Sequence, residues 1–133
     1  MSNSYLIIGG SSDIAIQTIH KLLVDGNHVT ILARDMSRVS QLAEQGVTVI
    51  EGDALDQDAL NSAIQAATDS GAGKISGVAH LVGSIVIRPP HALKVDAFEE
   101  VIRTNLTSAF LTLSLTGKAC LLYTSPSPRD SYG

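Results

Sequence analysis

A glycine-rich turn near the N-terminus has the residue types and spacing that bind phosphate groups. It follows a short apolar run at 5–8 and precedes a stretch of helical periodicity at 13–24. Glycine lets the backbone approach a pyrophosphate closely, and the free N–H groups of a first helical turn attract its negative charge. The alternative is an ordinary turn in which Ser12 or Asp13 caps the next helix. The candidate ligands are Gly9, Ser11, Ser12 and Ile14.

The rest of the chain must supply the elements that hold this turn in place. Short β-branched runs alternate with longer stretches in which apolar residues recur at helical spacing. Helical crossovers join parallel strands, so the pattern predicts an α/β fold with a Rossmann-type doubly wound parallel sheet. We expect three αβα layers, truncated after about four strands, with the ligand crevice at the carboxyl ends of the strands. The predicted strands are 5–8, 29–33, 47–50 and 78–82. The predicted helices are 13–24, 36–45, 56–71 and 95–116, and Asp56 is the expected N-cap of the third.

Composition excludes several classes of protein. The chain has 133 residues, enough for one modest domain, and its formal net charge of −4 offers no basic surface for nucleic acid. A single cysteine, Cys120, excludes an internal disulfide and fits a reducing compartment. The sequence shows no signal peptide and no membrane span, so we expect a cytoplasmic protein without a membrane partner.

The turn itself resembles a known motif. The segment Ile8 to Ala15 is similar to the Thr-Gly-x-x-x-Gly-x-Gly turn of the short-chain dehydrogenase/reductase family. Gly9 matches the first glycine of that motif, whereas Asp13 and Ala15 stand where the second and third usually lie. A carboxylate near a pyrophosphate is unfavourable unless it turns away to cap the helix. Alanine is a milder change, because it still allows close packing of helix and strand.

Later positions follow the family order. Arg34 directly follows the second predicted strand, where the family reads the 2′ position of the adenosine ribose. An arginine there pairs with a 2′-phosphate, whereas a carboxylate would accept from a free 2′-hydroxyl. Asp35 is able to cap the next helix, so the resemblance favours NADP, with NAD as the alternative. Taken alone, Arg34 is equally well read as a solvated surface charge.

The ends of the third and fourth strands also match. By the resemblance, Asp53 accepts a hydrogen bond from the adenine amino group, with Ala54 beside it; the alternative is a loop carboxylate in an Asx-turn. The family's Asn-Asn-Ala-Gly segment is replaced by His80 to Gly83, of which only the glycine is retained. Val82 and Gly83 are therefore expected to pass close to the nicotinamide ribose, and His80 to be a hydrogen-bonded strand-end residue.

Asn105 is the expected catalytic-site residue. It lies in a stretch, 103–110, that is similar to the family's segment in the helix after the fourth strand. In the family, the asparagine of that segment helps to order a water of the proton relay. Asn105 shares an apolar helical stripe with Phe98, Ile102, Ala109 and Leu113, so we expect it to be buried with its amide hydrogen-bonded. For an isolated asparagine, bonds to nearby backbone would be the alternative.

The resemblance implies an oxidoreductase that transfers hydride between a nicotinamide and the carbonyl or alcohol group of a small-molecule substrate. Family members often pair through the long helix, so the parent protein is expected to be a homo-oligomer. One alternative is a non-catalytic dinucleotide-sensing protein on the same fold, motivated by Asp13 and the altered fourth strand. A Rossmann-like methyltransferase is disfavoured, because it expects an acidic residue in place of Arg34.

The family's acid is a tyrosine followed four residues later by a lysine that lowers its pKa. Tyr5, Tyr123 and Tyr132 have no lysine at that offset. We therefore expect residues 1–119 to be an incomplete NAD(P)-binding domain, inactive by itself. The segment 120–133 resembles the conceptual translation of a sequencing adapter, and it is expected to be a non-native or disordered tail.

Overall fold

Four parallel strands form the centre of the molecule. The computed structural model describes the backbone of residues 3–123 and the side chains of residues 3–119. The strands are β1 (Ser4–Ile8), β2 (His28–Ala33), β3 (Thr48–Glu51) and β4 (Gly77–His80), in the order β3-β2-β1-β4. β1 pairs with both β2 and β4, so it is a central strand and places Ile8 beside Leu32 and His80. The chain therefore reverses its direction of sheet growth between β3 and β4, which is the topology of a doubly wound sheet.

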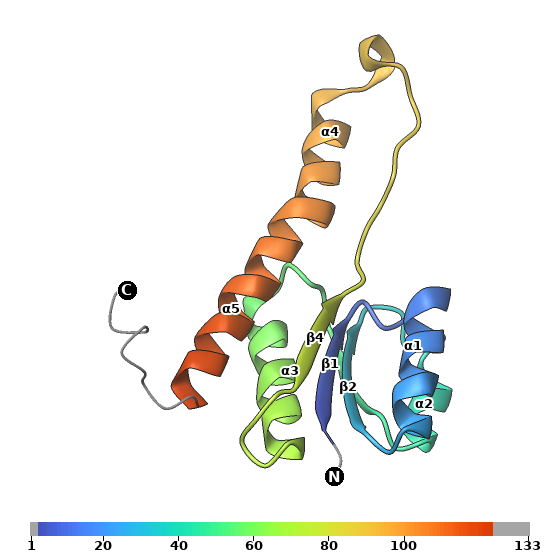
Figure 1. Cartoon of the computed structure of the whole chain (residues 1–133). Helices are drawn as coiled ribbons and strands as arrows, with labels where there is room; N and C mark the ends of the chain where they lie inside the picture. Colours follow the sequence, from blue (N-terminus) through green and yellow to red (C-terminus); the bar gives the residue numbers. More distant parts are fainter. Residues whose placement is uncertain (1–2, 124–133) are drawn as a thin grey trace.

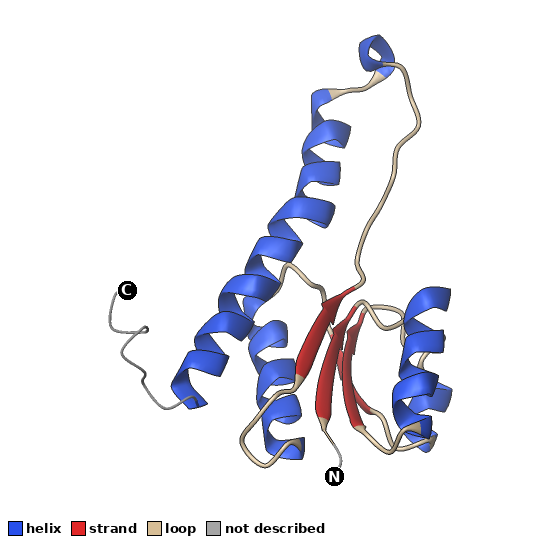
Figure 2. Cartoon of the chain, in the orientation of Figure 1, coloured by secondary structure: helices blue, strands red, loops and turns tan. Residues whose placement is uncertain are grey.

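Helices cover both faces of this sheet (Figures 1 and 2). α1 (Asp13–Val24) and α2 (Ser40–Glu44) lie on one face, and α3 (Gln57–Ser70) lies on the other. Successive strand residues point to opposite faces: Ile7 packs with α1, whereas Leu6 and Ile8 pack with α3. The predicted α/β fold with three αβα layers is confirmed, and two separate apolar clusters hold the helices to the sheet.

The N-cap predicted for the third helix is present. Asp56 has an extended backbone, and its carboxylate accepts hydrogen bonds from the amides of Asp58 (3.0 Å) and Ala59 (3.4 Å). We expect Asp56→Ala to lower the free energy of unfolding by about 1 kcal/mol, because the first amides of α3 lose their acceptor. Urea unfolding measures this change. Asp56→Ser keeps an acceptor, so an equal loss in that variant would contradict the capping role.

The fourth helical unit departs from prediction. A single helix is expected over 95–116, but the structure contains α4 (Val95–Ile102), a π-helical turn η2 (Arg103–Thr107) and α5 (Ser108–Tyr123). A short 3₁₀ turn, η1 (Pro90–Ala92), precedes them. α4 and the loop before it extend beyond the carboxyl ends of the strands (Figure 1). The helix continues into the predicted tail as far as Tyr123, and the rest of that tail lies outside the described residues.

The predicted apolar stripe of this helix is not its buried side. Phe98 is 52% exposed and Leu113 is 73% exposed, whereas Ser108, Thr112 and Thr116 are buried. The wider π turn changes which side of α5 faces the body of the molecule. Partly buried apolar residues of α5 pack on the cluster that includes α3, and the buried Thr116 hydroxyl donates to the Thr112 carbonyl. The stripe prediction was therefore wrong, because its large apolar residues are exposed in both α4 and α5.

None of the helices in the described part of the chain is both long enough and apolar enough to cross a membrane. Among the described residues there is also no group of three or more His, Cys, Asp or Glu side chains that could hold a metal ion.

Candidate functional site

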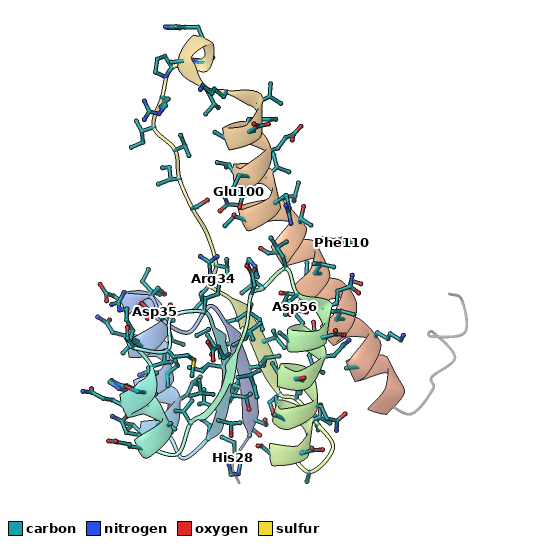
Figure 3. The ribbon with its side chains drawn as sticks, turned by 180° about the vertical axis from the view of Figure 1, so that it is seen from behind. His28, Arg34, Asp35, Asp56, Glu100 and Phe110 are labelled. Atoms are coloured by element: carbon teal, nitrogen blue, oxygen red, sulfur yellow. The ribbon has the colours of Figure 1, made fainter. Side chains whose placement is uncertain are left out.

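A cavity of about 890 Å³ opens at the carboxyl ends of the strands, where the doubly wound topology places ligands. Arg34 and Asp35 lie at this end of the sheet, whereas His28 marks the opposite end (Figure 3). The β1–α1 turn, the segment after β2, the β3–α3 loop, the segment after β4 and the π turn all contribute to its wall. Of the predicted residues, the cavity brings together Gly9, Ser11, Ser12, Arg34, Asp53, Ala54, Val82 and Gly83.

The glycine-rich turn forms one wall of the cavity. Gly9 has a φ of +91°, a conformation that side chains disfavour, and its amide donates to the Leu32 carbonyl at 2.8 Å. A Cβ atom on Gly9 would lie 2.7 Å from Val82 Cγ2 and 2.9 Å from the Leu81 carbonyl oxygen. The segment after β4 therefore fills the space where a side chain would be, and the turn packs closely against it.

Ser12 and Ile14 have roles that differ from simple ligand contacts. Ser12 is the N-cap of α1, and its hydroxyl oxygen accepts from the Ala15 amide at 3.1 Å while the residue lines the cavity. Ile14 is 72% exposed and does not line the cavity, so its side chain is not brought to the predicted ligand position. The N-terminus of α1 nevertheless opens onto the cavity, which is the feature that attracts phosphate groups.

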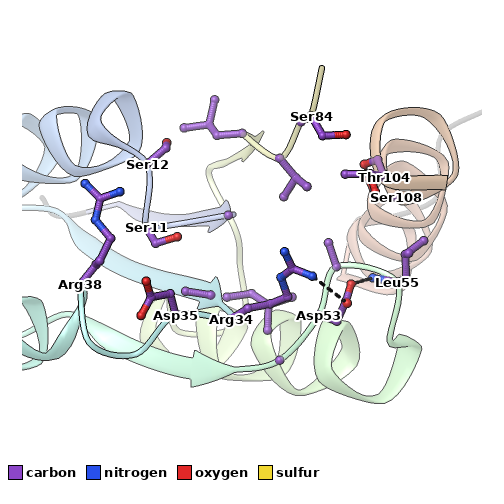
Figure 4. A pocket seen from close by; sticks show the side chains of 18 of the residues that line it. Ser11, Ser12, Arg34, Asp35, Arg38, Asp53, Leu55, Ser84, Thr104 and Ser108 are labelled. Atoms are coloured by element: carbon purple, nitrogen blue, oxygen red, sulfur yellow. Dashed lines mark hydrogen bonds and ion pairs between the residues drawn. The ribbon is translucent and has the colours of Figure 1, made fainter. Parts of the chain in front are cut away.

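The side chains of Arg34 and Asp53 point toward one another in the wall of the cavity (Figure 4). An Arg34 guanidinium nitrogen lies 3.5 Å from an Asp53 carboxylate oxygen, and both side chains are substantially exposed. The other carboxylate oxygen of Asp53 accepts from the Leu55 amide at 2.9 Å, which is the Asx-turn foreseen as an alternative role. Ala54 is buried against the cluster under α3 and so fixes the backbone of this loop.

A second ion pair was missed by sequence reasoning. Arg38 lines the cavity, and its guanidinium donates to the Asp13 carboxylate at 2.7 Å. Asp13 does not line the cavity and does not cap α1, since Ser12 is the N-cap; its carboxylate pairs with Arg38 instead. Arg38 lies in the turn before α2, which begins at Ser40, so no helical spacing in the sequence signals its position at the cavity.

Asp35 is held within its own loop. Its carboxylate accepts from the Ser37 amide at 3.1 Å and from the Ser37 hydroxyl, so it caps the turn after β2. The side-chain hydrogen bond from Ser37 is the main reason that the pKa of Asp35 is lowered. Asp35 also lines the cavity, so its carboxylate forms part of the cavity wall next to Arg34.

Asn105 ties the π turn to the loop after β4. Its amide oxygen accepts from the Ser84 amide at 3.0 Å, and its amide nitrogen donates to the carbonyls of Ser84 (3.0 Å) and Val101 (2.9 Å). It does not line the cavity, but an added Cβ on Gly83 would lie 3.1 Å from its amide oxygen. Asn105 is half-buried, and its amide is hydrogen-bonded as expected. The partners within 3.0 Å are backbone groups, and the Ser84 hydroxyl lies 3.4 Å from the amide nitrogen, so the contacts support a positioning role.

His80 is the last residue of β4. Its Nε2 lies 2.9 Å from Ser108 Oγ, and that hydroxyl donates to the Thr104 carbonyl, so His80 Nε2–H is the donor to Ser108. Thr104 and Ser108 both line the cavity and were also missed by the sequence analysis. The chain of hydrogen bonds joins strand β4 to the π turn, as expected for a hydrogen-bonded strand-end histidine.

Burial lowers the pKa of His80 below its ordinary value of 6.5. The unfolded chain therefore binds this proton more readily than the folded chain, so unfolding takes up a proton. We expect the free energy of unfolding to fall as the pH decreases through 6.5 and to level off below the folded-state pKa. Urea unfolding above and below pH 6.5 measures the effect. His80→Gln should reduce this pH dependence, whereas His28→Gln, at an exposed position, should retain it.

Comparisons with known proteins agree with this architecture. Solved structures similar to the chain include a short-chain dehydrogenase/reductase from Serratia marcescens (19% identity, TM-score 0.78) and one from Mycobacterium ulcerans (23%, 0.76). A 3-ketoacyl-(acyl-carrier-protein) reductase from Brucella melitensis, solved with NADH, is 17% identical with a TM-score of 0.75. The matches cover 88%, 90% and 85% of this chain and 50%, 48% and 48% of those chains, respectively.

The chain thus spans about half the length of these structures. A comparison with curated protein sequences found no match. The sequence model described as short chain dehydrogenase matches residues 3–121, which include every element from β1 to most of α5. By this match, the chain belongs to the short-chain dehydrogenase family.

Proposed function

We propose that the cavity at the carboxyl ends of the strands binds a nicotinamide dinucleotide, with NADP preferred over NAD. The whole protein would then be an oxidoreductase that acts on the carbonyl or alcohol group of a small molecule. The observation that carries the proposal is the meeting of the Gly9 turn, the N-terminus of α1 and Arg34 around one cavity. The relative from Brucella melitensis, which was solved with NADH, supports a nicotinamide dinucleotide as the ligand class.

The residues present fit such a cofactor. Gly9 lines the cavity and has no side chain, so this turn presents its backbone to a ligand. Backbone N–H groups at the start of α1 would hold the pyrophosphate, and Ser11, which lines the cavity, would supply its hydroxyl as a further donor. Arg34 would pair with the 2′-phosphate, and Asp53 would accept from the adenine amino group.

The nicotinamide end would lie toward the segment after β4. Gly83 adds no side chain to this segment. Asn105 holds the following residue, Ser84, in place by accepting a hydrogen bond from its amide. Thr104 and Ser108 supply hydroxyl groups on the same side of the cavity. When bound, the nicotinamide supplies the hydride-transfer chemistry, and these residues orient it and limit the access of water.

Dinucleotide binding to the full chain tests the proposal. We expect NADP⁺ to bind more tightly than NAD⁺, and S-adenosylmethionine not to bind, in isothermal titration calorimetry. Arg34→Gln should weaken NADP⁺ binding about tenfold, because a charge-assisted pair to phosphate is lost, and should leave NAD⁺ nearly unchanged. Arg88→Gln, an arginine that does not line the cavity, is the matched control. Equal loss of both dinucleotides in Arg34→Gln, or tighter binding of S-adenosylmethionine, would contradict the proposal.

A further inference from the structure

Each of the two arginines that line the described cavity already has a carboxylate partner within this chain. Arg34 lies 3.5 Å from Asp53, and Arg38 lies 2.7 Å from Asp13. The side chains of Arg38 and Asp13 are 48% and 86% exposed, so their pair remains open to competition from a ligand. A phosphate group entering the cavity must therefore compete with carboxylates of the protein for both guanidinium groups.

The two ion pairs differ in how firmly they hold the arginine. The Arg34–Asp53 contact is longer than an ordinary charged hydrogen bond, and Asp53 also accepts from the Leu55 amide. The Arg38–Asp13 contact has the length of a charge-assisted hydrogen bond. Asp13 stands in the first turn of α1, where the positive end of the helix dipole stabilises its negative charge. Arg38 is therefore the more firmly held of the two.

The position of Arg38 gives this pair a consequence for ligand choice. Arg38 lies four residues after Arg34, and both side chains line the same cavity. Its guanidinium points toward Ser12 at the start of α1, on the side away from Asp53 (Figure 4). If it were released from Asp13, it would be a second flexible cation beside the end of β2, where the 2′ position of a bound adenosine ribose lies.

We propose that Asp13 is a specificity-determining residue, which holds Arg38 at α1 and so withholds a second guanidinium from the 2′-phosphate of NADP. Asp13 thereby lowers the preference for NADP over NAD that Arg34 creates. This inference rests on the proposed dinucleotide function and adds to it a residue that limits cofactor selectivity. It also explains why a carboxylate is tolerated next to a phosphate site: its charge is matched by Arg38.

Calorimetric titration of the full chain and its variants with NADP⁺ and NAD⁺ tests the inference. We expect Asp13→Asn to tighten NADP⁺ binding about fivefold, the size of one exposed ion pair, and to change NAD⁺ binding less than about twofold. The gain should disappear in an Arg38→Gln background, because there is then no guanidinium to release. Asp58→Asn removes the same charge from the first turn of α3, away from the cavity, and should have no effect.

The outcomes separate this inference from the function on which it rests. Wild-type protein that binds neither dinucleotide would contradict the proposed function itself. Wild-type protein that binds NADP⁺ with an affinity unchanged in Asp13→Asn would overturn the role of Asp13 alone. Equal tightening of both dinucleotides, with or without Arg38, would also overturn it, since Asp13 would then act by repelling the pyrophosphate. Asp13→Ser repeats the test with a second uncharged residue, and thermal unfolding confirms that each variant is folded.

Discussion

Gly9→Ala is expected to abolish dinucleotide binding and to destabilise the fold. Two separate penalties apply at this position. The backbone has a φ of +91°, where a residue with a Cβ is strained, and the new atom would lie within 3.0 Å of the Leu81 backbone and Val82 Cγ2. The Leu81 carbonyl is a backbone group and cannot move away as the end of a flexible side chain could, and the peptide before it is held by the hydrogen bond from the Leu81 amide to the Ile8 carbonyl at 2.8 Å.

Relief of that collision requires the turn to move away from β4. The amides of Gly9 and Gly10 both donate to the Leu32 carbonyl, so movement of the turn breaks these bonds and displaces the start of α1. We expect a loss of a few kcal/mol in the free energy of unfolding, measured by urea denaturation, and no heat of binding with NADP⁺. Gly46→Ala is the matched control, since Gly46 also has a positive φ but nothing lies within 4 Å of its added Cβ.

Gly46→Ala should lose stability through backbone strain alone and should keep its dinucleotide affinity. If Gly9→Ala lost no more stability than this control and still bound NADP⁺, the close approach between the turn and β4 would have no importance for the site. The difference between the two variants therefore measures the collision with β4 separately from the cost of a left-handed backbone.

The sheet and its first three helices could be predicted from the sequence because each element has a local signal. β-branched runs define β1 to β3, and Ser12 and Asp56 are caps that the following periodicity makes easy to recognise. The predicted second helix, 36–45, is longer than the observed α2, because a side-chain hydrogen bond holds the residues before Ser40 in a turn. Asp35 holds Ser37 in a turn, so regular helix begins only at Ser40, although Val39 and Leu42 are buried as their spacing predicts.

The long helix could not be predicted in detail, because a π turn has no periodic signal. A five-residue turn at Arg103–Thr107 shifts every residue after it relative to a uniform helix. The same turn brings Thr104 and Ser108 to the cavity, and a period of 3.6 residues gives no reason to group these side chains with Arg34. Site residues that directly follow a strand can be identified from sequence motifs. Site residues on a helix far along the chain cannot, because their position at the cavity depends on how that helix packs.

Arg38 shows the same limit at the site itself. The strand ends predict that Gly9, Arg34, Asp53 and Gly83 share one edge of the sheet, and the cavity brings them together. An ion pair between Asp13 and Arg38 depends on the distance between the start of α1 and the loop before α2. That distance is set by the packing of both helices on the same face of the sheet, so it cannot be predicted from the sequence alone.

Ile31→Ala is expected to produce the second large effect, because the Ile31 side chain packs directly against the glycine-rich turn at Gly10. Ile31 is fully buried in the cluster formed by the sheet, α1 and α2. A Cβ added to Gly10 would lie 2.8 Å from Ile31 Cδ1, so this side chain already occupies the space directly beneath the turn. Removing three of its carbon atoms leaves a cavity that the neighbouring strands, held by their hydrogen bonds, can only partly fill.

We expect Ile31→Ala to lower the free energy of unfolding by about 2–5 kcal/mol in urea denaturation. Ile14→Ala is the matched control: the same atoms are removed from a residue that is 72% exposed, so its stability should change by about 0.5 kcal/mol or less. Because the turn also loses its support, NADP⁺ should bind more weakly to Ile31→Ala under conditions where the variant is fully folded. Unchanged affinity in the folded variant would show that the hydrogen bonds to the Leu32 carbonyl are sufficient to hold the turn, and similar destabilisation in both variants would contradict the packing described for Ile31.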